Sequence, residues 1–146
     1  MQVELLQPWS TFVMATRLPS AILEKMIRIV DEIIKKGEKE SVGAGQIKDQ
    51  FLIDPEILEQ EELMDFFLDM CRKYIVQAFC QTEPFNKENI LKEEWFTRLT
   101  GMWINSQKDK EYLPFHHHPD CDISSVMYLK IPEYLPSRNT ERDEDG

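Results

Sequence analysis

The chain has 146 residues, of which 42% are hydrophobic and 30% are charged, which is enough apolar material for one folded core. Its formal net charge of -10 argues against a protein that holds nucleic acid or anionic lipid by general electrostatics. No apolar run approaches the roughly 20 residues that a membrane-spanning helix needs, and the N-terminus lacks the features of a signal peptide. We therefore expect a single cytoplasmic domain, residues 1–146, without a nucleic-acid or membrane partner.

The three cysteines, Cys71, Cys80 and Cys121, are odd in number and have no CxxC spacing. A disulfide framework is therefore not expected, and reduced thiols are the simplest interpretation. Cys71 and Cys80 fall inside a helical pattern, where a small buried apolar residue is the expected role. Cys121 differs from them, because it is close to three histidines in the sequence.

Two short strands and a helix are predicted at the start of the chain. The strands are expected at residues 3–6 and 11–15, separated by a turn that contains Pro8. Apolar residues at helical spacing then predict a helix that begins after Ser20. It should end at Gly37, because two lysines precede this glycine and glycine can take the left-handed cap conformation.

A second helical region is predicted after a polar loop at residues 37–48 and the short apolar run Phe51-Leu52-Ile53. Asp54 and Pro55 suit the first turn of a helix, because aspartate accepts from free backbone N–H groups and proline needs none. The main helix is expected at about residues 61–79. Its buried face should contain Leu63, Phe67, Met70, Cys71, Tyr74, Ile75 and Ala78.

The second half of the chain predicts strands. From Glu94 onward the polar and apolar residues alternate, and one face of this long strand should carry Trp95, Thr97, Leu99, Gly101, Trp103 and Asn105. Residues 106–111 form a polar connection, and residues 123–131 are rich in residues that favour strands. Helices followed by strands predict an α+β domain in which helices brace one face of a mainly antiparallel sheet.

All three histidines of the chain, His116, His117 and His118, lie between the two predicted strands. In an extended segment residues i and i+2 share a face, so His116 and His118 can present two imidazoles to one ion while His117 points away. Asp120 and Asp122 have the same parity and could add a carboxylate. Two histidines and one carboxylate suit Fe(II) with open positions for substrate and oxygen.

Three other interpretations of the histidines stay open. The first is a zinc site of His116, His118 and Cys121, since a thiolate ligand favours zinc. The second is a polar loop in which the histidines only form hydrogen bonds. The third is nucleophilic catalysis by Cys121 with a histidine, for which proximity in the sequence is a weak signal.

A longer pattern surrounds the histidines. It consists of W-x-N, then HxHP, then a strand with a serine and a tyrosine, at Trp103, Asn105, His116, His118, Pro119, Ser124 and Tyr128. In order and spacing this segment, residues 103–132, resembles the 2-oxoglutarate/Fe(II)-dependent oxygenase family of marine bacteria and cyanobacterial viruses. The specific match is confined to this segment.

The resemblance implies a double-stranded β-helix, a jelly-roll or cupin-like sheet braced by helices, in which Fe(II) and 2-oxoglutarate serve to oxidise a substrate. It implies that His116 and His118 bind the metal, with Asp120 as the candidate for the carboxylate. It further implies that Tyr128 binds the distal carboxylate of the small-molecule cosubstrate 2-oxoglutarate and that Asn105 orients substrate or cosubstrate. For Tyr128 a core aromatic role, and for Asn105 a role in satisfying backbone groups, stay open. If the chain is viral, its compartment is the host cytoplasm.

Members of that family have a distal histidine on a later strand and, just beyond it, a basic residue that binds 2-oxoglutarate. Neither is found in this chain after Tyr128 in the expected context. No histidine follows His118, and Arg138 and Arg142 lie in the polar segment 133–146, which is expected to be a flexible tail. The chain also ends at Asp145-Gly146, a strong hairpin signal without a returning strand. We therefore expect the N-terminal part of an oxygenase domain, inactive by itself.

A non-catalytic binding or assembly module with the same outline is the alternative from another class. An incomplete barrel leaves strand edges unpaired, and a partner or a second copy of the chain could cover them. The sequence leaves both the enzymatic and the non-catalytic interpretation open.

Overall fold

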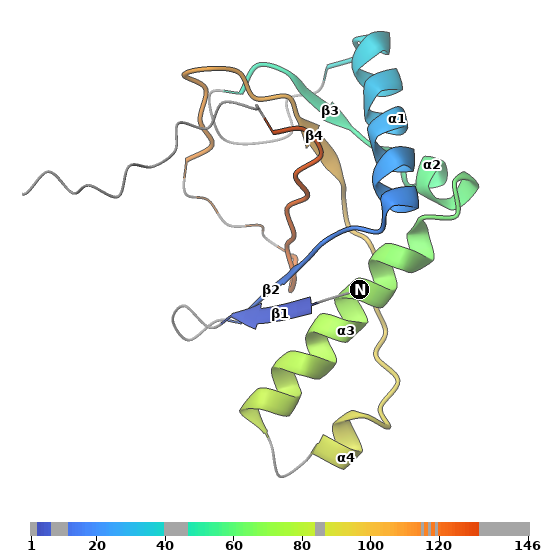
Figure 1. Ribbon diagram of the computed structural model, residues 1–146, viewed down its shortest axis with the longest axis vertical. Helices are drawn as coiled ribbons and strands as arrows, with labels where there is room; N and C mark the ends of the chain where they lie inside the picture. The colour runs from blue at the N-terminus through green and yellow to red at the C-terminus, as the bar shows by residue number, and fades with distance from the viewer. Residues whose placement is uncertain are drawn as a thin grey trace, which may run out of the picture.

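A computed structural model of the protein describes most of the chain, namely residues 3–6, 12–39, 47–83, 87–114, 116, 118 and 120–131. Within these residues the fold is mixed α+β, as predicted, with four helices and four strands (Figure 1). The strands form two separate two-stranded antiparallel sheets. No helix in the described part is long and apolar enough to cross a membrane. The predicted tail at residues 133–146 lies outside the described residues.

The first sheet is a hairpin at the start of the chain. Strand β1, Val3–Leu6, pairs with strand β2, Val13–Thr16, in a register that joins Val3 to Thr16 and Leu6 to Val13. The hydroxyl of Tyr74 donates a hydrogen bond of 2.8 Å to the backbone oxygen of Phe12, just before β2. This bond connects the hairpin to a helix from the middle of the chain. The predicted turn at Pro8 lies outside the described residues.

Helix α1, Ser20–Lys36, confirms the first predicted helix. Its buried stripe consists of Met26, Ile29 and Val30, which recur at the spacing of one helix face. Gly37 ends the helix with φ of 76°, and its N–H bonds to the backbone oxygen of Ile33 at 3.3 Å. The local signals in the sequence were therefore sufficient to place this element.

The second sheet lies against α1 and joins distant parts of the sequence. Strand β3, Gln50–Leu52, pairs antiparallel with strand β4, Trp103–Asn105. The ladder continues beyond the strands, because the N–H of Ile53 donates to the backbone oxygen of Met102 at 2.9 Å. Figure 1 shows this sheet to the left of α1 and the short helix α2 to its right.

Helix α2, Pro55–Gln60, begins as predicted. The carboxylate of Asp54 accepts a hydrogen bond of 3.0 Å from the N–H of Glu56, and proline occupies the first turn. The helix ends at Glu61, where the predicted main helix was expected to begin. Glu62 follows with φ of 58°, a left-handed conformation that separates α2 from the next helix.

Helix α3, Met64–Thr82, corrects the predicted helix at both ends. The predicted buried face is confirmed at Leu63, which is buried just before the helix, and Phe67 packs against the core, but no residue within α3 is fully buried. Figure 1 shows the reason, since α3 runs downward and away from α1 and the β3–β4 sheet. The short helix α4, Lys87–Ile90, lies beside its far end and was not predicted.

The hydrophobic core sits where α1, α2 and the β3–β4 sheet meet. Its buried members are Met26, Ile29, Val30, Phe51, Ile53, Leu58, Leu63 and Ile104. Two of them, Leu58 and Leu63, have no exposed surface at all. The core is therefore built by elements at one end of the molecule, while α3 and α4 extend from it.

The predicted long strand at residues 95–105 changes its inward face. Trp95, Thr97 and Leu99 are half-buried and alternate with exposed neighbours, as expected. Beyond the exposed Gly101 the pattern shifts by one residue, so that Ile104 is buried. The prediction of a single face is wrong, because a shift of one residue moves every later side chain to the other side.

The predicted strand at residues 123–131 is extended but makes no strand pairing with the described residues. Met127 and Leu129 pack against the core, while Val126 and Tyr128 between them are 77% and 75% exposed. The alternation expected of a half-buried strand is therefore present without a sheet. The segment runs through the centre of Figure 1 in dark orange, close to β4.

Candidate metal centre

His116 and His118 are brought together, and His118 lies next to Trp103 of β4. The ring centroids of the two histidines are 4.8 Å apart, and the rings meet edge to face at 83°. His116 is exposed and His118 is half-buried. The residue between them, His117, lies outside the described residues. Two imidazoles at this separation can approach one ion from adjacent directions, which is the arrangement expected from their i, i+2 spacing.

A backbone carbonyl determines the tautomer of His116. Its Nδ1 lies 2.8 Å from the backbone oxygen of Pro114. A carbonyl oxygen can only accept, so Nδ1 must carry the proton and donate it. The lone pair is then on Nε2, the atom through which a neutral histidine with such a carbonyl partner binds a metal.

Trp103 of β4 supports the second histidine. The centroid of its ring system lies 5.2 Å from that of His118, with 45° between the planes. This contact limits the rotation of a half-buried imidazole. Sequence reasoning gave Trp103 no role, although it belongs to the W-x-N pattern that the sequence shows.

A third ligand is not gathered with the histidines. No group of three or more His, Cys, Asp or Glu side chains that could hold a metal ion occurs among the described residues. Asp120 is exposed and has φ of 59°, which interrupts the extended backbone after His118. The parity argument that linked Asp120 to the histidines therefore does not apply to this conformation.

Cys121, the alternative ligand for zinc, is engaged elsewhere. Its thiol donates to the backbone oxygen of Ile123 at 2.8 Å. Cys121 also lies close enough to Cys71 to affect its titration. Burial first, and Cys121 second, raise the pKa of the Cys71 thiol. The Cys121 thiol acts as a hydrogen-bond donor in this structure, whereas zinc needs a thiolate.

The two residues predicted to bind the cosubstrate lie apart from the core. The side-chain oxygen of Asn105 accepts a hydrogen bond of 2.9 Å from the amide of Gln50, its partner across the β3–β4 sheet. Tyr128 is 75% exposed, so the alternative role as a core aromatic is wrong. Binding of 2-oxoglutarate by either residue stays a prediction.

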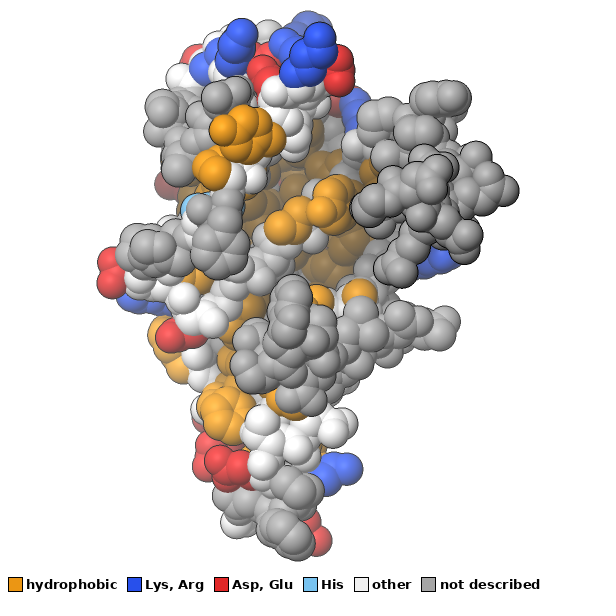
Figure 2. Space-filling view, turned by 90° about the vertical axis from the view of Figure 1, so that its left-hand side faces the viewer, with side chains coloured by type: hydrophobic (Ala, Val, Ile, Leu, Met, Phe, Trp, Pro, Cys, Tyr) orange, Lys and Arg blue, Asp and Glu red, His pale blue; other side chains and the backbone are white. Residues whose placement is uncertain are grey.

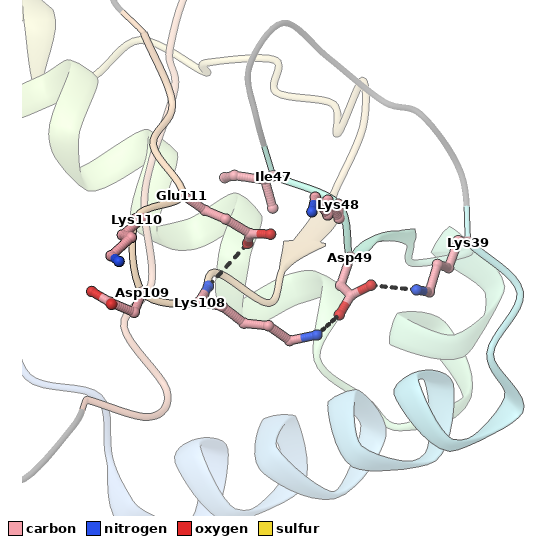
Figure 3. A pocket seen from close by; sticks show the side chains of 8 residues that line it. All are labelled: Lys39, Ile47, Lys48, Asp49, Lys108, Asp109, Lys110 and Glu111. Carbon is pink, nitrogen blue, oxygen red and sulfur yellow. Dashed lines mark hydrogen bonds and ion pairs between the residues drawn. The ribbon is translucent and has the colours of Figure 1, made fainter.

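A second candidate site is a charged hollow of about 770 Å³ at the other end of the β3–β4 sheet (Figure 3). Asp49 is bridged by the ammonium groups of Lys39 and Lys108, one on each carboxylate oxygen. Hydrogen bonds from Lys108 and then Lys39 lower the pKa of Asp49 to about 2. The hollow is also lined by Ile47, Lys48, Asp109, Lys110 and Glu111.

The chain matches no family model, no characterised protein and no solved structure to which it was compared. The comparisons therefore assign no activity by descent.

Proposed function

We propose that this protein contributes the first two metal ligands, His116 and His118, of an Fe(II)/2-oxoglutarate-dependent oxygenase. The observation that supports the proposal is the approach of the two rings to 4.8 Å, with the proton of His116 held on Nδ1 by Pro114. The jelly-roll fold belongs to the same proposal. Two imidazoles suit iron, and the carboxylate that completes the set has to come from Asp120 after a loop rearrangement or from outside the described residues.

In this proposal the chain binds and orients the metal. His116 would bind through Nε2, while Pro114 keeps Nδ1 protonated and Trp103 restrains the ring of His118. When bound, Fe(II) with 2-oxoglutarate and oxygen supplies the oxidising power for attack on a C–H bond. Tyr128 and Asn105 are the proposed contacts of the cosubstrate.

Titration with Co(II), an oxygen-stable substitute for Fe(II), tests the metal site. We expect saturable binding that is lost, or weakened by about tenfold or more, in His116→Ala and His118→Ala, because each removes one of few ligands. His117→Ala is the matched control and should bind like the parent, since alternate residues of an extended segment face apart. Binding unaffected by either ligand substitution would refute the site.

A separate measurement tests the cosubstrate. Addition of 2-oxoglutarate should tighten Co(II) binding, because a cosubstrate that chelates the metal is linked to it reciprocally. Tyr128→Phe should reduce this gain without changing binding of the metal alone. If metal binds normally but 2-oxoglutarate has no effect on its affinity, the metal site is supported and the oxygenase function is contradicted.

The alternative of a zinc site that includes Cys121 is tested by the same Co(II) titration. It predicts a thiolate-to-metal charge-transfer band in the Co(II) spectrum that disappears in Cys121→Ser. The hydrogen bond from Cys121 to the Ile123 oxygen favours the thiol, so we expect no such band. If the band is present, Cys121 is a metal ligand and the site is a zinc site.

A further inference from the structure

The extended segment at residues 121–131 exposes a regular row of side chains on one face. Every second residue from Asp122 to Lys130 is exposed, and this exposed row consists of Asp122, Ser124, Val126, Tyr128 and Lys130. Ser125 and Ile131 are exposed as well. Two members of the row are apolar or aromatic and largely solvent-exposed, Val126 at 77% and Tyr128 at 75%. Figure 2 shows that hydrophobic side chains reach the surface of this protein in several places.

The backbone of this segment is also available. No strand pairs with it among the described residues, and the one hydrogen bond that they make to its backbone is local, from the Cys121 thiol to the Ile123 oxygen. Met127 and Leu129 hold the segment against the core by their side chains. An extended segment that is fixed from one side, and whose backbone forms no ladder with the described residues, is a template for an added strand.

The exposed row is complementary to itself. When two copies pair antiparallel with Val126 opposite Val126, Asp122 of each copy faces Lys130 of the other. Ser124 then faces Tyr128. Both charge pairs are of opposite sign, and the two apolar residues of each copy lie at the centre of the contact. A strand with this symmetry of charge selects a second copy of itself over an unrelated partner.

The complementarity is specific to one register. A shift of one copy by two residues in one direction places Lys130 opposite Ser124. The shift in the other direction places Asp122 opposite Tyr128 and Lys130 opposite Asp120, whose left-handed backbone, with φ of 59°, does not continue an extended strand. A shift by one residue turns the row toward the other face of the sheet. We propose that residues 121–131 pair antiparallel with the same segment of a second copy, about a two-fold axis at Val126.

Lys130 already has a partner within its own chain, the carboxylate of Asp31 on α1. Both side chains are more than half exposed, at 61% and 52%. Exposed pairs of this kind contribute little to stability, so Lys130 can turn to Asp122 of the second copy at small cost. Asp122 has no ion pair within the described part of the chain, which leaves its carboxylate free for this contact.

A cysteine at the two-fold axis tests the geometry. In the proposed register residue 126 opposes itself, with Cβ atoms about 4.5–5.5 Å apart, close to the separation that a disulfide needs. Val126→Cys should therefore form a covalent dimer rapidly under a mild disulfide oxidant such as oxidised glutathione. Phe96→Cys, which replaces a residue 90% exposed on another segment, is the matched control and should cross-link slowly.

A charge exchange tests the pairing independently. Sedimentation over a concentration series should show a monomer–dimer equilibrium that weakens by about tenfold or more in Lys130→Asp, because two attractive pairs become repulsive. Lys130→Asp with Asp122→Lys should restore it. Asp31→Asn removes the internal partner of Lys130 and should leave the dimer intact, which separates the two contacts.

Two results would overturn the proposal. One is a monomer at every concentration, in which case the exposed row belongs to another partner or to further chain. The other is a dimer that persists in a folded Val126→Asp variant, which would place the contact elsewhere. Replacing His116 and His118 by alanine should not affect the dimer, so failure of the metal site and failure of this interface are distinguishable.

Discussion

Asp49 illustrates how a single residue organises its surroundings in an acidic chain. The chain carries a formal charge of -10, yet four of the eight residues that line the charged hollow are lysines. Asp49 is 14% exposed at its side chain and accepts from two of them, Lys39 and Lys108. It follows that this carboxylate connects the end of α1 and the segment after β4 to the start of β3 (Figure 3).

The lowered pKa of Asp49 predicts a pH dependence of stability. A carboxyl with a folded pKa of about 2 and an ordinary value of 3.8 binds its proton more readily when unfolded. Its contribution is therefore fully present above pH 3.8 and is lost as the pH falls toward 2. Urea unfolding as a function of pH should show this loss in the parent, and Asp49→Asn should be less stable at neutral pH and lack that component.

Asp109→Asn is the matched control for this prediction. It removes a negative charge from the same hollow but leaves both lysine contacts of Asp49 in place. The control should keep the acid-dependent loss of stability. If stability depends on pH in the same way in the parent and in Asp49→Asn, the lowered pKa of Asp49 is not the cause of the acid-dependent loss.

At the scale of elements, the two long helices differ in how they are held. Helix α1 buries three residues in the core, whereas α3 buries none. The outer part of α3 is held by the hydroxyl of Tyr74 and by the ring of Phe79, which stacks on Trp95 at 5.1 Å. Local stability follows burial, so the two helices should open independently.

Amide hydrogen exchange measures this difference. We expect amides in the centre of α1 to exchange only with global unfolding, and amides in the last two turns of α3 to exchange faster by about tenfold or more. Tyr74→Phe should accelerate exchange in α3 and leave α1 unchanged, because the lost hydrogen bond joins α3 to Phe12 and does not involve α1. Equal protection of α1 and α3 against hydrogen exchange would contradict a core that stabilises α1 more than α3.

The same contrast explains which elements the sequence could predict. Helix α1 has local signals at its boundaries and one apolar stripe, and the structure shows the helix end and the buried face that these signals predict. The break between α2 and α3 depends on the left-handed conformation of Glu62, which no residue preference indicates. The change of inward face near Gly101 depends on pairing with β3, a contact across about half of the chain.

At the scale of the whole molecule, one part of the candidate metal site could be predicted from the sequence and another part could not. The sequence placed His116 and His118 together because two residues of an extended segment share a face. Their neighbours could not be predicted, since Trp103 reaches His118 through the fold and the carbonyl of Pro114 acts through backbone geometry. A third metal ligand would likewise have to reach the histidines through a contact between distant parts of the chain.

The contact between Trp103 and His118 gives the molecule an intrinsic optical reporter. A paramagnetic ion such as Co(II) quenches the emission of an indole at close range, and this indole lies 5.2 Å from one proposed ligand. Metal uptake should therefore dim the fluorescence of the unlabelled protein. Trp103→Phe should remove most of the signal without abolishing binding, whereas Trp95, stacked on Phe79, should continue to emit. One aromatic neighbour thus makes the occupancy of the site measurable by light.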